Sequence, residues 1–504
     1  MVRTKDYGPR TKQPAYNAWM RSIRGIRKAL FFAALACALL AGAAVPSTQP
    51  AAAFDASFTG STMRVDYFHS GGMGQEIVAL DRVVSDGAWA GSRTRLVDDL
   101  NLGKYLFEVI DRDTNRPIYS RGFASIYGEW ETTAEYKTMH RTFGESLRFP
   151  WPKSPVQVVL KKRDRDNSFH ELWSTSIDPD SRFVNRADPP KAGNVWTLFE
   201  SGPAAQKVDI LLISEGYTAA QMPKFRADAK RLVDALFAVE PFKSRKNDFN
   251  VRGLELPSAQ PGVNRPHVGS FRRTPISAEY NIFDSERYLL TLDNRAFRDA
   301  AASAPYEFIE ILANEQQYGG GGIFNDQATT AVDTGFAEYV FVHEFGHHFA
   351  ALADEYYTSD VAYETGAADL PEPWEPNITA LKDSSRLKWR DLVEPGTPIP
   401  TPWDKPEYET HSRETQARRR ALLAKKVAET EVDALFREQL AWDAKFLSSM
   451  KYSGKVGAFE GAGYEAKGLY RPEADCIMFT RDPVGFCRVC RRAIGRIIDQ
   501  YARP

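Results

Sequence analysis

Residues 339–347 read Tyr339-Val340-Phe341-Val342-His343-Glu344-Phe345-Gly346-His347 and place an HExxH pattern within an apolar run. On an α-helix, residues four positions apart lie on one face. The two histidines can therefore hold a single Zn²⁺ ion, and Glu344 then projects beside a water molecule on that ion. The stretch predicts a helix that carries a metal site.

The residues around the motif favour a metal site over the alternative, a core helix with two partly buried histidines. Phe341, Val342, Phe345 and Phe349 surround the imidazoles with apolar side chains. An apolar shell limits the access of solvent and strengthens electrostatic interactions at a metal.

The residue types of the motif predict hydrolysis of a peptide bond. Zinc held by two imidazoles and a third protein ligand keeps one position open for water and lowers the pKa of that water to about 7. Glu344 can then act as the general base and later pass the proton to the leaving amine.

The third ligand is expected downstream, and Asp354 is the favoured residue. The longer metzincin pattern, HExxHxxGxxH, requires glycine at position 350 and histidine at position 353, and this chain has alanine at both. On an unbroken helix Asp354 would lie roughly 10 Å along the axis from His347, so it can bind only if the helix ends near Ala350 and the chain turns back. Glu355 and a distant residue remain alternatives, and either carboxylate could instead form an outer hydrogen bond to a ligand.

A second cluster follows more than 100 residues later, where Cys476 and Met478 precede Cys487 and Cys490. A methionine in this position is similar to the Met-turn that forms an apolar floor beneath zinc in metzincins.

Several segments together resemble the zinc metallopeptidases related to the bacterial IgA protease of the metzincin group. They are HEFGHHFAALADEYY at 343–357, VDILLISEGYT at 208–218, YGGGGIFN at 318–325, GAGYEAKGLYRPEADCIM at 461–478 and FCRVC at 486–490. The resemblance covers the chain from about residue 195 and implies a metzincin-like α/β zinc peptidase domain behind a β-rich N-terminal domain. It implies that His343, His347 and Asp354 bind zinc, that Glu344 is the general base and that Met478 is the Met-turn residue.

Three cysteines remain once an export segment that contains Cys37 is removed. In an exported protein an odd number indicates one disulfide with a free thiol, or a shared metal. The spacing of Cys476, Cys487 and Cys490 resembles the structural zinc site of archaemetzincins, whose partner cysteine falls close to Asp354. We favour a disulfide and one catalytic Zn²⁺; the alternative is a second, structural ion, which Asp354 could serve instead of the first.

The N-terminal 53 residues are interpreted as an export signal. Four basic residues between Arg21 and Lys28 precede the 17-residue apolar stretch 29–45, which is short for a membrane span. Met20 could be the true start, and an uncleaved anchor is the alternative. We therefore expect a periplasmic or extracellular protein without stable membrane insertion after processing. The formal net charge of -1 gives no reason to expect nucleic acid as a partner.

The remaining 451 residues divide into two predicted domains. Alternating apolar and polar residues at 54–187 indicate an antiparallel β-sandwich. His69, His140 and His170 are expected to be ordinary surface or interface histidines in it. Residues 188–193 form a linker, and 195–504 form the peptidase domain.

Within the second domain, the pattern predicts a buried parallel strand at 208–214 and a helix from Met222 to Phe237, started by a capping box of Thr218 and Gln221. Another strand is expected at 308–313. The glycines at 319–322 permit close approach of backbone, and the resemblance to metzincins implies that this segment is a sheet edge that pairs with an extended substrate; the alternative is a flexible loop. One or two helices are expected in an insertion at about 407–450, either at the rim of the cleft or as a solvated hairpin.

These observations predict a secreted zinc metalloendopeptidase that acts on proteins or peptides. Two alternatives stay open: an exported protein-binding or glycan-binding module with a vestigial zinc site, and a zinc hydrolase of non-peptide amides.

Overall fold

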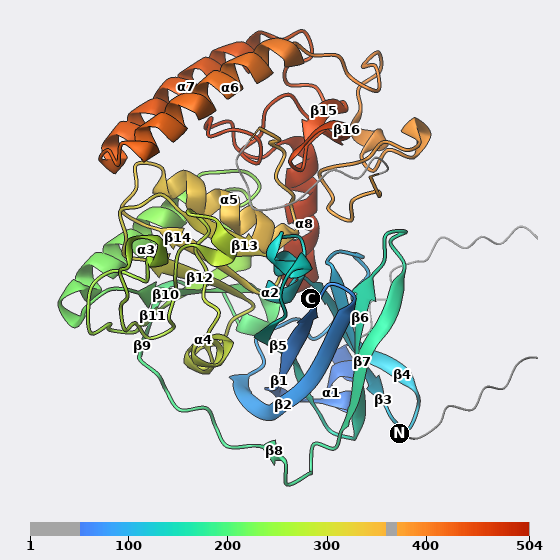
Figure 1. Ribbon diagram of the computed structural model, residues 1–504. Coiled ribbons are helices and arrows are strands. Elements are labelled where there is room, and N and C mark those ends of the chain that lie inside the picture. Colours follow the sequence, from blue (N-terminus) through green and yellow to red (C-terminus); the bar gives the residue numbers. More distant parts are fainter. Residues whose placement is uncertain (1–50, 359–369, 503–504) are drawn as a thin grey trace, which may run out of the picture. The chain divides into compact units, whose positions relative to one another are not determined.

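The computed structural model describes residues 51–358 and 370–502, so the predicted export signal lies outside the described residues except at its last three positions. This part of the chain is a mixed α/β structure with a β-rich N-terminal region (Figure 1). None of its helices combines the length and the apolar character that a membrane span requires.

The N-terminal region contains two four-stranded sheets that share a hydrophobic core. One sheet has the order β5-β1-β2-β8 and the other the order β4-β3-β6-β7, and neighbouring strands are antiparallel except for β2 and β8. The strands are β1 (Phe58–Gly72), β2 (Gln75–Ala88), β3 (Tyr105–Asp111), β4 (Arg116–Phe123), β5 (Arg141–Pro152), β6 (Val156–Arg163), β7 (Phe169–Ile177) and β8 (Val184–Asn185). Short helices α1 (Ala51–Ser57) and α2 (Ile126–Trp130) accompany them.

The alternation along β1 places apolar and charged residues on opposite faces, and both faces are buried. Met63, Val65 and Tyr67 enter the core between the two sheets. Arg64, on the other face, binds Asp66 at 2.9 Å and Asp86 at 2.5 Å, and it also contacts Asp299 from the later part of the chain. The charged face of this strand is thus covered by protein instead of water.

A six-stranded sheet forms the centre of the second region, with the order β13-β14-β12-β10-β11-β9. The four inner strands run parallel and the two outer strands antiparallel to their neighbours. The strands are β9 (Asn194–Phe199), β10 (Val208–Glu215), β11 (Phe249–Glu255), β12 (Phe308–Ala313), β13 (Gly320–Ile323) and β14 (Gln327–Ala331). The predicted strands at 208–214 and 308–313 are both present as parallel strands.

Helices cover both faces of this sheet. Residues Val208, Ile210 and Leu212 of β10 share one core with α3 (Met222–Leu236), α5 (Ala337–Ala350) and α8 (Arg488–Ala502). Leu211 and Ile213 face the other side, where α4 (Asn294–Ala301) packs. The capping box of Thr218 and Gln221 is present before α3, as the sequence predicts.

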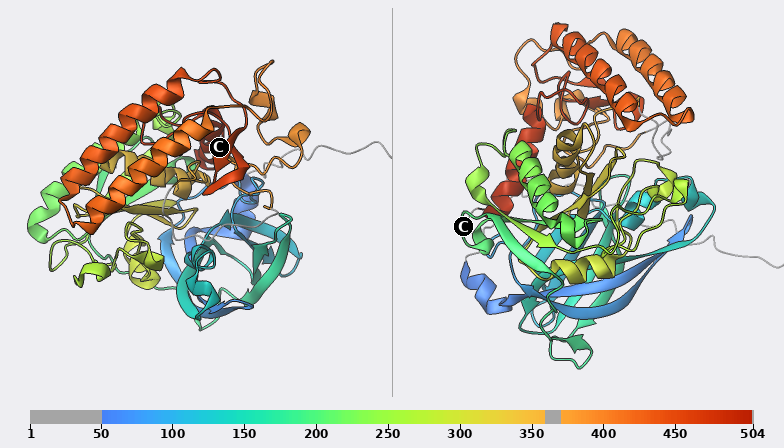
Figure 2. Two further views of the ribbon diagram at one scale, coloured as in Figure 1. Left: turned by 45° about the horizontal axis from the view of Figure 1, so that its top comes forward. Right: turned by 90° about the vertical axis from the view of Figure 1, so that its left-hand side faces the viewer.

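The insertion forms two helices, α6 (Lys405–Ala424) and α7 (Glu429–Ser449), which lie side by side (Figure 2). A hairpin of β15 (Phe459–Ala462) and β16 (Glu465–Arg471) follows. Short 3₁₀ helices occupy 135–137, 204–206, 219–221, 246–248, 266–268, 282–284, 384–386 and 390–392.

The expectation that His69 is an ordinary surface or interface histidine is wrong, because this residue is fully buried between two carboxylates. Its Nδ1 lies 2.9 Å from Glu145 and its Nε2 lies 2.9 Å from Glu76, and its ring stacks on Tyr127 at 3.9 Å. Burial by itself lowers the pKa of His69, but the carboxylates outweigh it and raise the pKa to about 9.

This environment predicts a pH-dependent stability that His69→Gln should remove. Since the folded pKa is about 9 and the unfolded pKa about 6.5, the contribution is complete below pH about 6.5 and disappears as the pH rises towards 9. We expect the free energy of unfolding of the unaltered protein to lose about 3 kcal/mol relative to that of His69→Gln across this pH range. Denaturant unfolding of both proteins at several pH values measures the difference. His170→Gln, at an exposed position, is the control, and a difference that does not change with pH would contradict the prediction.

Candidate metal centre and active-site cleft

Helix α5 ends one residue before a left-handed turn that reverses the chain. Ala351 has φ 55° and ψ 30°, and its N–H donates to the carbonyl of His347 at 3.1 Å. The N–H of Leu352 donates to the carbonyl of Gly346 at 3.3 Å. A left-handed alanine costs roughly 1–2 kcal/mol, and it is held here in the buried interior. The condition that the sequence set for Asp354 as a ligand, an early end of the helix, is therefore met.

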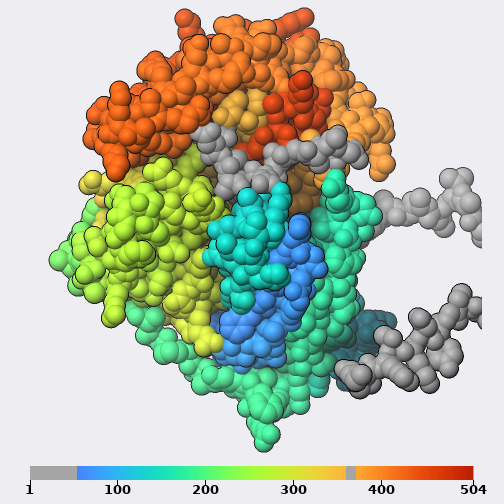
Figure 3. Space-filling model, viewed as in Figure 1, coloured from blue at the N-terminus to red at the C-terminus, as the bar shows by residue number. Residues whose placement is uncertain are grey.

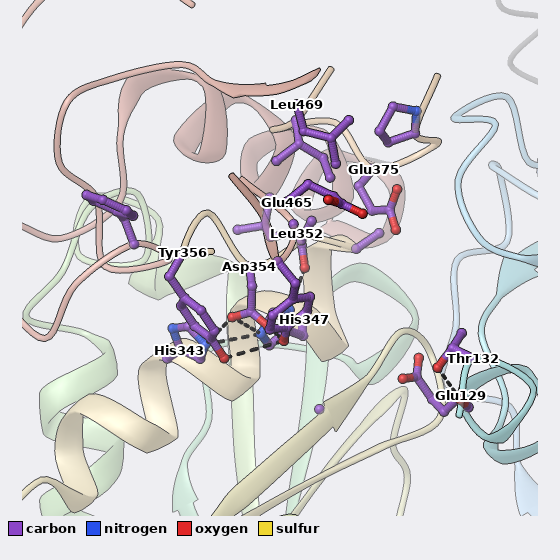
Figure 4. A pocket seen from close by; sticks show the side chains of 18 of the residues that line it. Glu129, Thr132, His343, His347, Leu352, Asp354, Tyr356, Glu375, Glu465 and Leu469 are labelled. Carbon is purple, nitrogen blue, oxygen red and sulfur yellow. Dashed lines mark hydrogen bonds and ion pairs between the residues drawn. The ribbon is translucent and has the colours of Figure 1, made fainter. Parts of the chain in front are cut away.

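The reversal brings three ligand atoms together, as Figure 4 shows. The Nε2 atoms of His343 and His347 are 3.1 Å apart. Oδ1 of Asp354 lies 3.0 Å from the first and 3.3 Å from the second. Two imidazole nitrogens and one carboxylate oxygen are a donor set that zinc accepts, and three protein ligands leave a position open. The residues fit the metal.

Hydrogen bonds on the far side of each ligand fix which atom faces the centre. Nδ1 of His343 lies 2.9 Å from the carbonyl of Ile477, and Nδ1 of His347 lies 2.5 Å from the carbonyl of Leu352. Both Nδ1 atoms therefore donate, which leaves the lone pair of each Nε2 for a metal. The Tyr464 hydroxyl donates to Oδ2 of Asp354, so Oδ1 stays directed at the centre.

The carboxylate of Asp354 and the imidazole of His347 shift each other's pKa. Burial would raise the pKa of Asp354, but His347 and His343 outweigh it and hold that pKa far below its usual range. Burial lowers the pKa of His347, and Asp354 raises it to about 9. A bound metal would take the place of the proton that His347 carries at neutral pH.

Glu344 lies between the two histidines on α5 and lines the adjoining cavity. Burial raises the pKa of its carboxyl group, and the neighbouring His343 and His347 act in the opposite direction. A carboxylate with a raised pKa accepts a proton more readily than one in water.

Met478, the predicted Met-turn residue, lies against Gly346 of α5. It is fully buried, and a Cβ added at Gly346 would lie 3.0 Å from its sulfur. The preceding carbonyl, that of Ile477, orients His343. The Met478 carbonyl accepts the N–H of Glu355 at 2.8 Å.

Glu355, the alternative third ligand, points away from the histidines. Its Oε1 lies 3.2 Å from the sulfur of Cys490 and accepts a hydrogen bond from Asn377 at 3.0 Å. Asp354 is thus the carboxylate that reaches the histidines. Cys476, Cys487 and Cys490 are free thiols, so the structure does not contain the disulfide that the sequence favoured.

A cavity of about 680 Å³ opens over the centre. Besides the centre itself, its walls include the N-terminal region, the glycine strand β13 and the helical pair α6–α7, together with residues from the segments 283–288, 370–378 and 463–481. Their lining residues include Lys104, Glu129, Arg163, Asn167, Gly320, Gly322, Tyr408, Gln416, Gln439 and Asp443. The α6–α7 pair, orange in Figure 3, therefore contributes to the wall of the cavity, as one of the two interpretations of the insertion predicted.

The glycine run forms a strand at the sheet edge beside α5, and the flexible-loop interpretation is wrong for 320–323. A Cβ at Gly322 would lie 2.3 Å from the carbonyl oxygen of Glu344, so only glycine lets the strand approach the helix this closely. The outer edge is partly occupied, because Gly320 exchanges hydrogen bonds of 3.2 Å with Arg287 and Leu289.

Sequence reasoning missed the residues that orient the ligands. Tyr464 follows Gly463, and Gly461 and Gly463 have φ of 106° and 55°. Glycines two apart indicate a tight turn, and this was the available signal. The carbonyls of Leu352 and Ile477 carry no sequence signal, since every residue has one.

Two family models match the chain. A family model described as IgA Peptidase M64 matches residues 196–498, and a model described as Peptidase M64 N-terminus matches residues 53–174. No curated protein matches the chain.

The close contact between β13 and α5 predicts that Gly322→Ala destabilises the protein. The added methyl group meets a backbone oxygen that cannot move aside, and such overpacking costs about 1–3 kcal/mol. Thermal unfolding should show a lower midpoint. Gly495→Ala in α8, where nothing lies within 4 Å, is the matched control and should be neutral or slightly stabilising. Equal midpoints for the two variants would contradict the packing argument.

The ligand geometry predicts that Asp354→Ala weakens Zn²⁺ binding by more than about 100-fold, because a direct ligand is lost. Tyr464→Phe, which removes only the supporting hydroxyl, should weaken binding by about 10–100-fold. Titration calorimetry with Zn²⁺ measures both. Asp180→Ala, at a position whose side chain is 82% exposed, should bind like the unaltered protein. Unchanged affinity of Asp354→Ala would exclude this residue as the ligand.

Proposed function

We propose, since the chain belongs to the IgA peptidase M64 family and is a metallopeptidase, that it is a secreted zinc-dependent endopeptidase of proteins and peptides. One observation carries the proposal: His343, His347 and Asp354 meet at the wall of a cavity that Glu344 also lines. Export is proposed from the N-terminal sequence pattern alone.

The centre would hold its metal through Nε2 of His343, Nε2 of His347 and Oδ1 of Asp354. Zinc bound there supplies a Lewis acid and a water of lowered pKa. Glu344 takes the proton of the attacking water and then delivers it to the leaving amine. The carbonyls of Ile477 and Leu352 accept hydrogen bonds from the Nδ1 atoms, so both imidazoles present Nε2 to the metal in a fixed orientation.

The cavity supports a polypeptide substrate over a small amide. Its volume of about 680 Å³ leaves room for several residues of an extended segment. Gly322, at the adjacent sheet edge, presents its backbone without a side chain to a substrate. The hydrogen bonds of Gly320 to Arg287 and Leu289 prevent a substrate from pairing along the whole of β13. Lining residues of both charges, such as Arg163 and Glu129, give no preference for an acidic or a basic substrate.

A binding module with a vestigial zinc site is less well supported. Such a protein would not need Glu344, nor the hydrogen bonds that direct Nε2 of both histidines at the centre. No observation favours a non-peptide amide over a peptide.

Glu344→Gln should lower the rate of peptide hydrolysis by at least about 10²–10⁴-fold, because the amide cannot accept the proton. Its zinc content should stay unchanged, since Glu344 is not a ligand. The assay is cleavage of a broad library of quenched fluorescent peptides by zinc-loaded protein, with the metal measured in parallel.

Glu338→Gln is the matched control, because Glu338 lies on the same helix and pairs with Arg231. This variant should cleave at the normal rate. The proposal would be overturned if the zinc-loaded protein cut no peptide in the library, or if Glu344→Gln cut as fast as the unaltered protein.

A further inference from the structure

Four buried side chains that can bind a metal, one carboxylate and three thiols, converge next to the metal centre, on the opposite side of the loop that follows α5. They are Glu355, Cys476, Cys487 and Cys490, and none is more than 5% exposed. One ligand atom from each lies within 4.8 Å of all the others. None of the four is a ligand or the base of the centre described above.

The distances within this four-residue cluster suit a shared ion and not a disulfide. The sulfurs of Cys476 and Cys490 are 3.9 Å apart, whereas a disulfide requires about 2.05 Å. In a tetrahedral zinc site with bonds of about 2.3 Å, ligand sulfurs lie roughly 3.8 Å apart. Oε1 of Glu355 lies 3.2 Å from the sulfur of Cys490 and 3.9 Å from that of Cys487. These values bracket the roughly 3.5 Å expected between an oxygen and a sulfur on one zinc.

Backbone N–H groups donate to two of the three sulfurs, those of Cys476 and Cys487. The N–H of Cys487 donates to the sulfur of Cys476 at 3.3 Å, and the N–H of Cys490 donates to that of Cys487 at 3.4 Å. Cys487 immediately precedes α8 and Cys490 lies in its first turn. The positive end of a helix dipole favours thiolates at such positions.

Only one of the two carboxylate oxygens of Glu355 has a hydrogen-bond partner among the described residues. Asn377 donates to its Oε1 at 3.0 Å and holds the side chain in place. Its Oε2 is fully buried, and among the described residues it has no hydrogen-bond partner. An ionised carboxylate in this position is costly unless a cation compensates it. The buried Arg471 offers one positive charge near Glu355, which is too little for three thiolates and a carboxylate.

We propose that Glu355, Cys476, Cys487 and Cys490 bind a second Zn²⁺ ion. Thiolate ligands select zinc over the harder magnesium and calcium ions. Four protein ligands close the coordination sphere, so the ion is structural and takes no part in hydrolysis.

The position of this second site indicates that the ion would stabilise the loop that carries Asp354. Glu355 directly follows Asp354, and its N–H bonds to the carbonyl of Met478, two residues after Cys476. An ion held by Glu355 and Cys476 therefore ties the loop that carries Asp354 to the segment under the helix and to the start of α8. It stabilises the left-handed turn at Ala351 from outside the first metal centre.

The test is the zinc content of the purified full-length protein, measured by elemental mass spectrometry with the protein concentration determined independently. We expect two ions per chain. The double variant His343→Ala/His347→Ala should keep one ion, and Glu355→Ala should also keep one. The proposal is overturned if the unaltered protein holds one ion, or if the double histidine variant holds none.

A second measurement covers the case in which Glu355→Ala does not fold. The double histidine variant is loaded with Co²⁺ and its absorption spectrum recorded. Thiolate ligation gives an intense sulfur-to-cobalt charge-transfer band in the near ultraviolet, which a site of nitrogen and oxygen ligands lacks. Absence of this band, or a disulfide between any two of the three cysteines found by mass spectrometry of the denatured protein, would contradict the second site.

Discussion

The left-handed turn at Ala351 is the constraint on which the described site depends. It ends α5 less than one turn after His347 and sends the chain back, so that Asp354 meets His343 and His347. The same turn directs the next side chain, Glu355, towards the cysteines. A strained alanine is therefore stabilised by contacts on both sides of one short loop.

The segment around Met478 is the counterpart of that loop. Its carbonyls bind the ring of His343 and the N–H of Glu355, and its methionine fills the space beneath Gly346. Residues more than 100 positions apart in the chain thus share one hydrogen-bond network. Long-range contacts of this kind fix the orientation of ligands more firmly than the helix alone could.

Several helices and strands of the second region could be predicted from the spacing of apolar residues along the chain. The unbroken apolar run at 208–214 required burial on both faces, and it is the central parallel strand β10. The spacing of apolar residues after Gln221 predicted α3, and the spacing of His343 and His347 predicted their shared face on α5. Local pattern failed where burial depends on distant partners: the charged face of β1 meets Asp299, and His69 lies between Glu76 and Glu145.

The sequence by itself determined the chemistry of this protein, because a pair of histidines one helical turn apart with a glutamate between them suits metal-assisted hydrolysis in almost any setting. It left the third ligand and the state of the cysteines open. Only the tertiary structure decided which carboxylate lies beside the histidines, since that depends on a backbone conformation at Ala351 that alanine rarely adopts and that packing imposes. It also brought Glu355 to the three cysteines, because contacts between distant segments cannot be derived from the spacing of residues along the chain.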